Sequence, residues 1–572
     1  MEEIKKLPGI KLLSRYKKSW FRSDILAGIV LTTLLVPQGM AYAELAGLPA
    51  ITGLYTTVLC LFGYALFGPS KILVLGPDSS LGPLIAAIVL PIAVSNGDPG
   101  QAVILASLLS LIVGVIMILA GVAKLGFIAD LLSKPTRVGY MNGLALTILV
   151  SQLPKLFGFS TDANGFIEEV RLFVVGLANG RTLVPSLLVG LISIIIIFVL
   201  NRWIPKLPGI LVAVVTAIGL SIAFDLESKG VSVVGSLPQG LPPFTIPTVS
   251  FSSLTLLIVG AFGIALVSLA DTISTASAFA AKRGEEVKGN REMIGIGAAN
   301  ILAGFFQGFP VSTSGSRTAV AEQSGAKTQF TGVFAALMIL VMLAVAPWLL
   351  KPLPQPVLAA IVIAASFSLA DYPALRRLWQ QRKSEFLLSI SALLGVVIVG
   401  ILEGIAIAIF LSVLNIFRRA WWPHATTLGK VPGIAGHHDT EQYPEAKVTP
   451  GLIIYRFDAP LFFANTNTFR DQIRKFARSK PRWIIVASAP ITDVDTTAAD
   501  MILDLDKELN KKNIHLVFAA LKNPVRQKLE RYELIGPLEE SHFYPTIESA
   551  VNAYQGFTDT EWEDKNTRKP KT

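Results

Sequence analysis

The sequence predicts an α-helical multi-pass membrane protein with fourteen spans, followed by a C-terminal α/β domain. Three observations support this fold class. First, the chain is 52% hydrophobic and only 16% charged, whereas soluble domains are roughly 25% charged. Second, the deficit of charge is confined to residues 24–421, and the chain after Trp422 has an ordinary soluble composition. Third, two apolar segments are interrupted by polar residues where they should cross a membrane.

Composition and charge divide the chain into five parts. We predict a basic cytoplasmic arm, a transmembrane domain, a linker containing Pro and Gly, an α/β domain and a charged, disordered tail. In that order, these parts are residues 1–23, 24–421, 422–450, 451–555 and 556–572.

Fourteen apolar runs are candidates for membrane spans, because a span requires about 20 apolar residues and a half-helix fewer. The runs are 24–43, 50–68, 72–93, 101–121, 136–154, 183–201, 208–224, 252–280, 291–309, 311–323, 329–349, 355–370, 384–400 and 403–420. Residues 163–178 have the pattern of a helix that lies in the membrane interface.

The positions of Lys and Arg predict the topology. An even number of spans places both termini on the same side, and the connections on that side carry most of the basic residues between the runs. Since cytoplasmic loops are enriched in Lys and Arg, we expect an integral protein of the cell (inner) membrane with both termini in the cytoplasm. The net charge of +10 comes mostly from short basic clusters between the apolar runs. This placement suits a membrane topology better than a nucleic-acid-binding face, so no nucleic-acid partner is expected.

The two interrupted segments are residues 73–91 and 305–329. Each begins as a short extended run, turns at Gly-Pro or Phe-Pro, and resumes as a helix rich in small residues. Unpaired backbone is tolerated at membrane depth only inside protein or beside a water-filled cavity. The breaks fall in the third and tenth spans, seven apart, which predicts two inverted seven-helix repeats whose half-helices meet near the midplane.

Two helix beginnings that face each other would attract an anion, because each carries free N–H groups and roughly half a positive charge. Here they are residues 76–80 and 314–317. Glycines permit close approach of a ligand, and Arg317 adds a forked donor suited to oxyanions. The alternative is that Arg317 extends towards the interface or pairs with a structural carboxylate. The sequence therefore predicts a small inorganic anion as the substrate.

Two of the acidic residues within the predicted spans are candidates for function. Asp271 is followed one turn later by Thr275, and a carboxylate with hydroxyl oxygens suits Na⁺, or a proton on the carboxylate itself. The alternative role for Asp271 is to pair with Arg317. Asp78 is interpreted either as a helix cap or as a second site linked to a proton or cation.

Several functions are excluded by residues that are absent from the sequence. The only cysteine is Cys60, and the five histidines all follow the membrane domain. No nucleophile–base pair, metal cluster or Gly-rich phosphate loop is present in the sequence. We therefore expect no enzymatic activity, no cofactor, and no metal other than a sodium ion at Asp271.

The C-terminal part alternates strands and helices. LIIYRF at 452–457, WIIVASAP and IHLVFAA have the pattern of buried strands, and amphipathic helices lie between and after them. This alternation predicts an α/β sandwich.

Three motifs resemble those of the sulfate permease (SulP) anion transporters, relatives of pendrin and prestin. They are PQGMAYAELAGLPAITGLY at 37–55, GPDSS at 76–80 and SGSRTAVAEQSGAKTQFTG at 314–332. The resemblance extends over residues 20–555. It implies a fourteen-helix inverted-repeat membrane domain, a C-terminal STAS domain and a homodimer in membrane lipid.

The resemblance also implies roles for individual residues. Those implied for the substrate are Gln38 and Tyr42 on the first helix, and Gly76, Asp78, Ser79, Ser314, Gly315, Ser316 and Arg317 at the breaks. Asp271 and Thr275 match the spacing of Na⁺ ligands in the cyanobacterial bicarbonate transporters of the family. Thr496 and Thr497 are candidates for the phosphorylatable position of sigma-factor antagonists, and the alternative is that they cap a helix.

The predicted function is secondary active, cation-coupled transport of an inorganic anion. Sulfate is the first candidate, followed by bicarbonate or a small dicarboxylate. One alternative is an anion channel or a conductive protein regulated by its STAS domain. Another is a membrane-anchored sensor or scaffold without flux. The sequence leaves open the anion, the choice of Na⁺ or H⁺, and symport against exchange. It also leaves open whether the STAS domain is phosphorylated or binds a partner.

Overall fold

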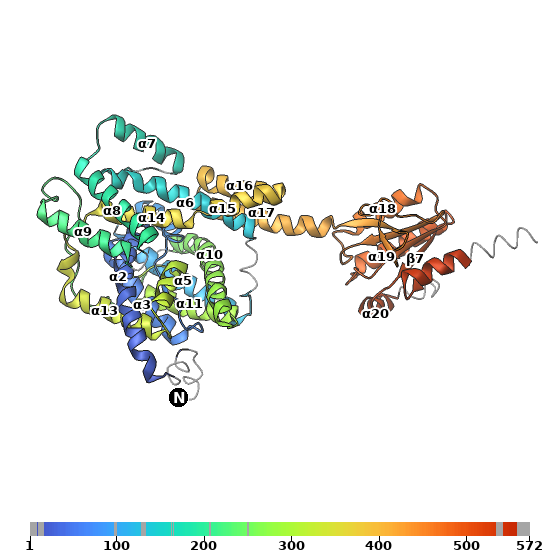
Figure 1. Cartoon of the computed structure of the whole chain (residues 1–572), viewed down its shortest axis with the longest axis horizontal. Coiled ribbons are helices and arrows are strands. Elements are labelled where there is room, and N and C mark those ends of the chain that lie inside the picture. The colour runs from blue at the N-terminus through green and yellow to red at the C-terminus, as the bar shows by residue number, and fades with distance from the viewer. Residues whose placement is uncertain are drawn as a thin grey trace, which may run out of the picture. The chain divides into compact units, whose positions relative to one another are not determined.

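The computed structural model describes residues 9, 16–95, 100–126, 133–161, 163, 165–204, 207–248, 251–533 and 542–556. The chain forms two compact units, Met1–Ser412 and Val413–Thr572 (Figure 1). Most of the predicted arm, and the predicted tail beyond residue 556, lie outside the described residues.

The first unit is helical, and every apolar run predicted as a span contains a helix. The helices are α2 (Phe21–Leu45), α3 (Ala50–Phe67), α4 (Gly82–Ser95), α5 (Gln101–Val122), α6 (Lys134–Leu156), α8 (Val184–Trp203), α9 (Gly209–Ala223), α10 (Phe251–Arg283), α11 (Gly289–Gly304), α12 (Gly315–Gln323), α13 (Phe330–Val345), α14 (Gln355–Leu369), α16 (Lys383–Leu394) and α17 (Ile401–Trp421). A π-helical turn, Gly395–Val399, follows α16.

Length and apolar composition alone qualify seven helices of the described chain to cross a membrane. The helices α4, α9 and α13 are apolar but shorter. The total of fourteen spans therefore stays a prediction, although the helices lie where the runs predict them.

Two further helices lie between the spans. The segment predicted to lie in the interface forms α7 (Phe166–Ala178), on which Ile167 and Val174 are exposed. The amphipathic helix α15 (Tyr372–Gln381) is not predicted from the sequence, and Asp371 caps it by accepting from the backbone N–H of Ala374 at 3.0 Å.

The two interrupted segments meet. Strand β1 (Leu75–Gly76) pairs antiparallel with β2 (Ser312–Thr313), so that Leu75 lies opposite Thr313 and Gly76 opposite Ser312. This pairing satisfies backbone groups that lipid could not, and it confirms that the breaks come together. It is also the pairing that inverted halves require, while the symmetry of the complete halves stays a prediction.

Glycines bring the helices around these strands into close contact, as is usual between membrane helices. A Cβ atom on Gly53 of α3 would lie 1.9 Å from the carbonyl oxygen of Gly39 on α2. A Cβ atom on Gly297 of α11 would lie 2.7 Å from the carbonyl oxygen of Gly114 on α5. Larger side chains at these positions would move the helices that carry the site.

The second unit contains a six-stranded sheet in the order β4-β3-β5-β6-β7-β8. Its strands are β3 (Ala425–Lys430), β4 (His437–Asp439), β5 (Leu452–Phe457), β6 (Trp483–Ala487), β7 (His515–Ala519) and β8 (Phe543–Tyr544). Strands β5 to β8 are parallel, whereas β3 is antiparallel to both of its neighbours. The helices are α18 (Thr466–Ala477), α19 (Thr496–Asn510) and α20 (Asn523–Arg531). The predicted α/β architecture is confirmed.

The interpretation of residues 422–450 as a linker is wrong. Strands β3 and β4 lie within that segment, and β3 pairs with β5 in the centre of the sheet. In β3 the buried Thr426 and Leu428 alternate with half-buried residues, a pattern that Pro and Gly in the rest of the segment obscured.

Candidate functional site

The centre of the site is Arg317, in the first turn of α12. Only 1% of its side chain is exposed, and its Nη2 lies 3.4 Å from Oδ2 of Asp78. Its Nε and Nη1 atoms have no hydrogen-bond partner among the described residues. A guanidinium carries five N–H donors, and buried donors are normally paired. Arg317 therefore retains donors for a bound anion.

Gly76 provides the space that Arg317 occupies. A Cβ atom at this position would lie 2.4 Å from Nη1 of Arg317. The sequence assigned the small size of Gly76 to the approach of a ligand. The structure shows the guanidinium as the close neighbour of Gly76, and the role of Gly76 towards a ligand stays a prediction.

Asp78 starts the helical turn that leads into α4. Its Oδ1 accepts hydrogen bonds from the backbone N–H of Ser80 at 3.0 Å and from the Ser80 hydroxyl at 2.8 Å. Its carbonyl oxygen accepts from the N–H groups of Leu81 and Gly82. These contacts are those of a residue that caps a turn, whereas a proton- or cation-linked role of Asp78 stays a prediction. The helix itself begins at Gly82, later than the predicted start at 76–80.

Ser80 connects Asp78 with Asp271. Its hydroxyl is fully buried and lies 2.8 Å from Oδ1 of Asp78 and 3.1 Å from Oδ2 of Asp271. A hydroxyl has one hydrogen to donate, so it can serve only one of the two carboxylates. The second contact becomes a hydrogen bond when that carboxyl group is protonated. The sequence places Ser80 in the helix beginning at 76–80, but it does not predict that Ser80 connects the two carboxylates.

The carboxylate of Asp271 contacts Ser80, and Arg317 pairs with Asp78. The alternative that Asp271 is the ionic partner of Arg317 is therefore wrong. The helix α10 runs without interruption through Asp271 and Thr275. The hydroxyl of Thr275 lies 4.0 Å from the position of a Cβ atom on Gly315, so this face of α10 lies beside the start of α12.

The beginning of α12 is open on one side. Ser314 is its N-cap and accepts from the N–H of Arg317 at 3.5 Å, and the hydroxyls of Ser314 and Ser316 lie 3.0 Å apart. Gly315 and Ser316 are exposed, although they follow directly on the buried strand β2. The predicted backbone donors are therefore accessible from outside the protein core.

The first helix contributes Gln38 and Tyr42, which are 8% and 5% exposed. Tyr42 interacts with Ser79 and lies within electrostatic range of Asp78 and Arg317. The Oε1 atom of Gln38 is buried without a hydrogen-bond partner among the described residues. The structure thus places Tyr42 at the site. The Oε1 atom of Gln38 remains able to accept a hydrogen bond.

Three other residues near the site were missed. Arg137 and Tyr140 on α6 lie within electrostatic range of Asp271, and Asn300 accepts from the N–H of Val311 beside β2 at 3.0 Å. In the sequence, Arg137 is only one of the many basic residues whose positions predict the topology. Nothing in the local sequence distinguishes Tyr140 or Asn300, because their proximity depends on helix packing.

Asp24 was also missed as a functional residue. It is fully buried and accepts hydrogen bonds from the N–H groups of Lys327 and Thr328 and from the hydroxyls of Tyr16, Thr328 and Thr331. These contacts fix the segment between α12 and α13. The sequence feature that could have identified Asp24 is its position as an acidic residue at the start of an apolar run.

Thr496 and Thr497 are exposed at the first positions of α19 in the second unit. Their interpretation as helix caps is wrong, because Asp495 is the N-cap and accepts from the N–H of Ala498 at 2.8 Å. Neither threonine hydroxyl therefore acts as the N-cap of α19.

Known proteins with this arrangement transport anions. Residues 21–392 match the sulfate permease family, and residues 443–550 match the STAS domain. A "Probable sulfate transporter" of Mycobacterium tuberculosis is 40% identical over 96% of this chain and 98% of its own. "Sulfate transporter 4.1, chloroplastic" of Arabidopsis thaliana is 30% identical over 95% of this chain and 82% of its own.

Solved structures agree with these similarities. The inward-facing murine Solute Carrier 26 family member A9 anion transporter has a TM-score of 0.88 and 25% identity, over 96% of this chain and 94% of its own. The transmembrane domain of the cyanobacterial bicarbonate transporter BicA shares the fold, with a TM-score of 0.61 and 21% identity over 70% of this chain and 98% of its own.

Fold and site together define a multi-pass membrane protein that transports anions and carries a C-terminal STAS domain. The chain belongs to the sulfate permease family. It is a transporter and not an enzyme.

Proposed function

We propose that this protein takes up sulfate by secondary active transport coupled to a cation, either Na⁺ or H⁺. Bicarbonate and small dicarboxylates are the next candidates. The relatives named as sulfate transporters support sulfate as the first candidate.

The charges of the residues at the site are the observation that supports coupling to a cation. Arg317 supplies one positive group, and Asp78 and Asp271 supply two carboxylates, linked through Ser80. With both carboxylates ionised, these three contacting groups have an excess of negative charge, which the more distant Arg137 offsets only in part, and they would repel an anion. A proton or Na⁺ at Asp271 removes this excess, and it also gives the Ser80 hydroxyl a consistent set of contacts.

In the proposed complex, sulfate accepts hydrogen bonds from the free donors of Arg317 and from the exposed start of α12. Tyr42 and Gln38 line the opposite side, and Ser79 and Ser316 add hydroxyl donors. Thr275, one turn after Asp271, is positioned to supply an oxygen ligand to Na⁺. The protein is proposed to act as a homodimer in the inner membrane, with both termini in the cytoplasm.

Uptake into proteoliposomes tests this proposal. We expect saturable uptake of radiolabelled sulfate that is driven by either a Na⁺ gradient or a pH gradient imposed alone. Competition with bicarbonate and with dicarboxylates then ranks the substrates. Unitary currents without dependence on a cation gradient would indicate a channel, and absence of flux for every anion would indicate a scaffold.

A further inference from the structure

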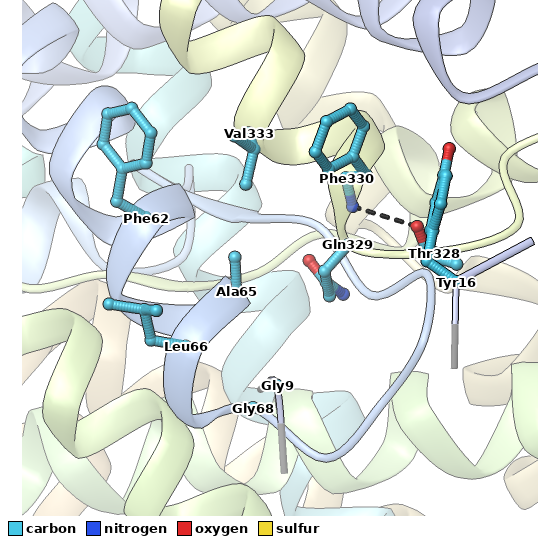
Figure 2. Close-up of a pocket in the computed structure, with 10 residues that line it drawn as sticks. All are labelled: Gly9, Tyr16, Phe62, Ala65, Leu66, Gly68, Thr328, Gln329, Phe330 and Val333. Atoms are coloured by element: carbon cyan, nitrogen blue, oxygen red, sulfur yellow. Dashed lines mark hydrogen bonds between the residues drawn. The ribbon is translucent and has the colours of Figure 1, made fainter. Parts of the chain in front are cut away.

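Two cavities in the membrane unit lie side by side, away from the anion site. One, of about 240 Å³, is an apolar cleft. Figure 2 shows Phe62, Ala65 and Leu66 of α3 along one side of it, and Phe330 and Val333 of α13 along another. We call it the apolar cleft.

The other cavity, of about 760 Å³, is rich in charge, and we call it the basic cavity. Its lining contains six basic and three acidic side chains, which leaves an excess of positive charge. Lys71 is paired with Glu285, whereas Lys288, Arg291 and Lys327 are exposed and form no ion pair in the described part of the chain.

The two cavities share three stretches of chain. Tyr16, Gly68 and Gln329 line the apolar cleft, while their neighbours Lys17, Pro69 and Lys327 line the basic cavity, and Thr328 lines both. The apolar cleft and the basic cavity therefore adjoin along these stretches.

Two of the free cations lie where the helix itself disfavours them. Lys288 is the N-cap of α11 and Arg291 lies in its first turn. The N-terminus of a helix carries partial positive charge and stabilises anions rather than cations. Both side chains and the helix N-terminus thus favour an anion in the basic cavity. Glu292, in the same turn, opposes them, but its carboxylate accepts hydrogen bonds from Tyr64 and Ser70.

We propose that the paired cavities bind one anionic phospholipid, with the phosphate headgroup in the basic cavity and an acyl chain in the apolar cleft. Basic pockets between membrane helices on the predicted cytoplasmic side fit such headgroups. The neighbouring Trp20, with Lys17 5.5 Å from its ring, is a residue pair typical of the membrane interface. The occupant is a lipid rather than a free phosphate because the apolar lining has no counterpart in a soluble anion.

Native mass spectrometry of the full-length protein in detergent tests the proposal. Phosphatidylglycerol and phosphatidylcholine with identical oleoyl chains are titrated separately, and glycerol phosphate serves as a headgroup without chains. We expect selective retention of phosphatidylglycerol. Each basic residue near a membrane surface contributes roughly fivefold to anionic lipid binding, so the double variant Lys288→Ala/Lys327→Ala should bind it roughly 25-fold more weakly.

A matched control removes two exposed charges outside the cavity, Arg376→Ala/Arg377→Ala on α15, and should bind the lipid as the unchanged protein does. Val333→Trp fills the apolar cleft and should weaken phosphatidylglycerol binding without changing glycerol phosphate binding. Leu66→Ser, at the exposed side of the cleft, is the milder variant if Val333→Trp impairs folding.

Equal retention of the two lipids would overturn the proposal, as would an equal loss in the control variant. Glycerol phosphate that binds as tightly as the lipid would show a site for soluble anions. Selective lipid binding that arises only after deletion of residues 1–15 would assign the cavities to the N-terminal arm instead.

Discussion

The guanidinium of Arg317 lies 3.4 Å from the carboxylate of Asp78, although 239 positions separate the two residues in the chain. Each residue belongs to one of the two interrupted segments, and the β1–β2 pair brings these segments together. The ion pair therefore places a positive group where the two segments meet, and two guanidinium nitrogens have no hydrogen-bond partner among the described residues. We expect both the function and the assembly of the site to depend on this pair, and variants can separate the two.

Arg317→Ala should abolish sulfate uptake and destabilise the protein. The variant leaves Asp78, whose side chain is 12% exposed, without its partner, and breaking a buried pair costs about 3–5 kcal/mol. Thermal unfolding in detergent and uptake into proteoliposomes measure the two effects. The double variant Arg317→Ala/Asp78→Asn should recover most of the stability and none of the uptake. Substantial uptake by either variant would contradict the role of Arg317.

Asp271→Asn should abolish cation-driven accumulation of sulfate. The amide cannot carry a proton and holds Na⁺ poorly, yet it retains an oxygen that can accept from Ser80. Uptake under separate Na⁺ and pH gradients measures the effect. Asp225→Asn, at an exposed turn, is the matched control and should behave as the unchanged protein. Undiminished uptake with the same ion dependence in Asp271→Asn would refute the coupling role.

Asp24→Asn should destabilise the membrane unit by about 2–3 kcal/mol. Asp24 accepts five hydrogen bonds in a fully buried position, and hydrogen bonds to charged groups contribute about 1.5–3 kcal/mol each. The amide also turns an N–H group towards existing donors. Thermal unfolding in detergent is the measurement.

Tyr16→Phe is the matched control for Asp24→Asn, because it removes one of the five donors and leaves the carboxylate. Burial, followed by the charge of Asp24, raises the pKa of Tyr16 to about 12, so the hydroxyl stays a donor at neutral pH. We expect a smaller loss, of about 1 kcal/mol. Equal losses in both variants would show that the backbone contacts of Asp24 contribute little.

The sequence predicted the parts of the fold that depend on local pattern. Apolar runs located the helices of the membrane unit, and the Gly-Pro and Phe-Pro breaks located the strands that pair. It also identified Arg317 and Asp271, because charge within an apolar domain is conspicuous. These signals require no knowledge of which helices are neighbours.

Partners could not be predicted, because they depend on packing between distant segments. Arg317 pairs with Asp78 rather than Asp271, and Ser80 lies between the two carboxylates. A Cβ atom at position 76 would clash with the guanidinium of Arg317. Strand β3 was missed because its partner β5 lies beyond a Pro- and Gly-containing stretch.

Acidification should loosen the edge of the sheet in the STAS domain. Burial lowers the pKa of His437 on β4, while Glu548 acts in the opposite direction, and Lys430 and His438 add to the lowering. The folded state therefore favours the neutral ring, whereas the unfolded chain titrates near pH 6.5. The stability of this region is complete above that pH and is lost as the pH falls towards the lowered pKa.

Hydrogen exchange of β4 in the full-length protein, at about pH 7.5 and about pH 5.5 and corrected for intrinsic rates, measures this effect. We expect weaker protection at the lower pH, and no pH dependence in His437→Gln. An unchanged pH response in that variant would assign the effect to other groups, since Asp439, whose pKa is lowered chiefly by a hydrogen bond from Thr426, titrates in a lower range.

Ser80→Ala should alter cation coupling while leaving the affinity for sulfate nearly unchanged. The hydroxyl lies between Asp78 and Asp271 and has one hydrogen for two carboxylates, so its removal isolates Asp271. We expect the cation concentration for half-maximal uptake to change about tenfold, since a change of 1.4 kcal/mol corresponds to that factor. Uptake at varied cation and varied sulfate concentrations separates the two constants.

Ser79→Ala is the matched control, because Ser79 interacts with Tyr42 and not with the carboxylates described for Ser80. It should weaken the apparent affinity for sulfate and preserve the cation dependence. These two results together would assign the anion and the cation to different sides of one turn. If Ser80→Ala changed only the sulfate constant, the carboxylates would act on the anion directly, and coupling through this hydroxyl would be excluded.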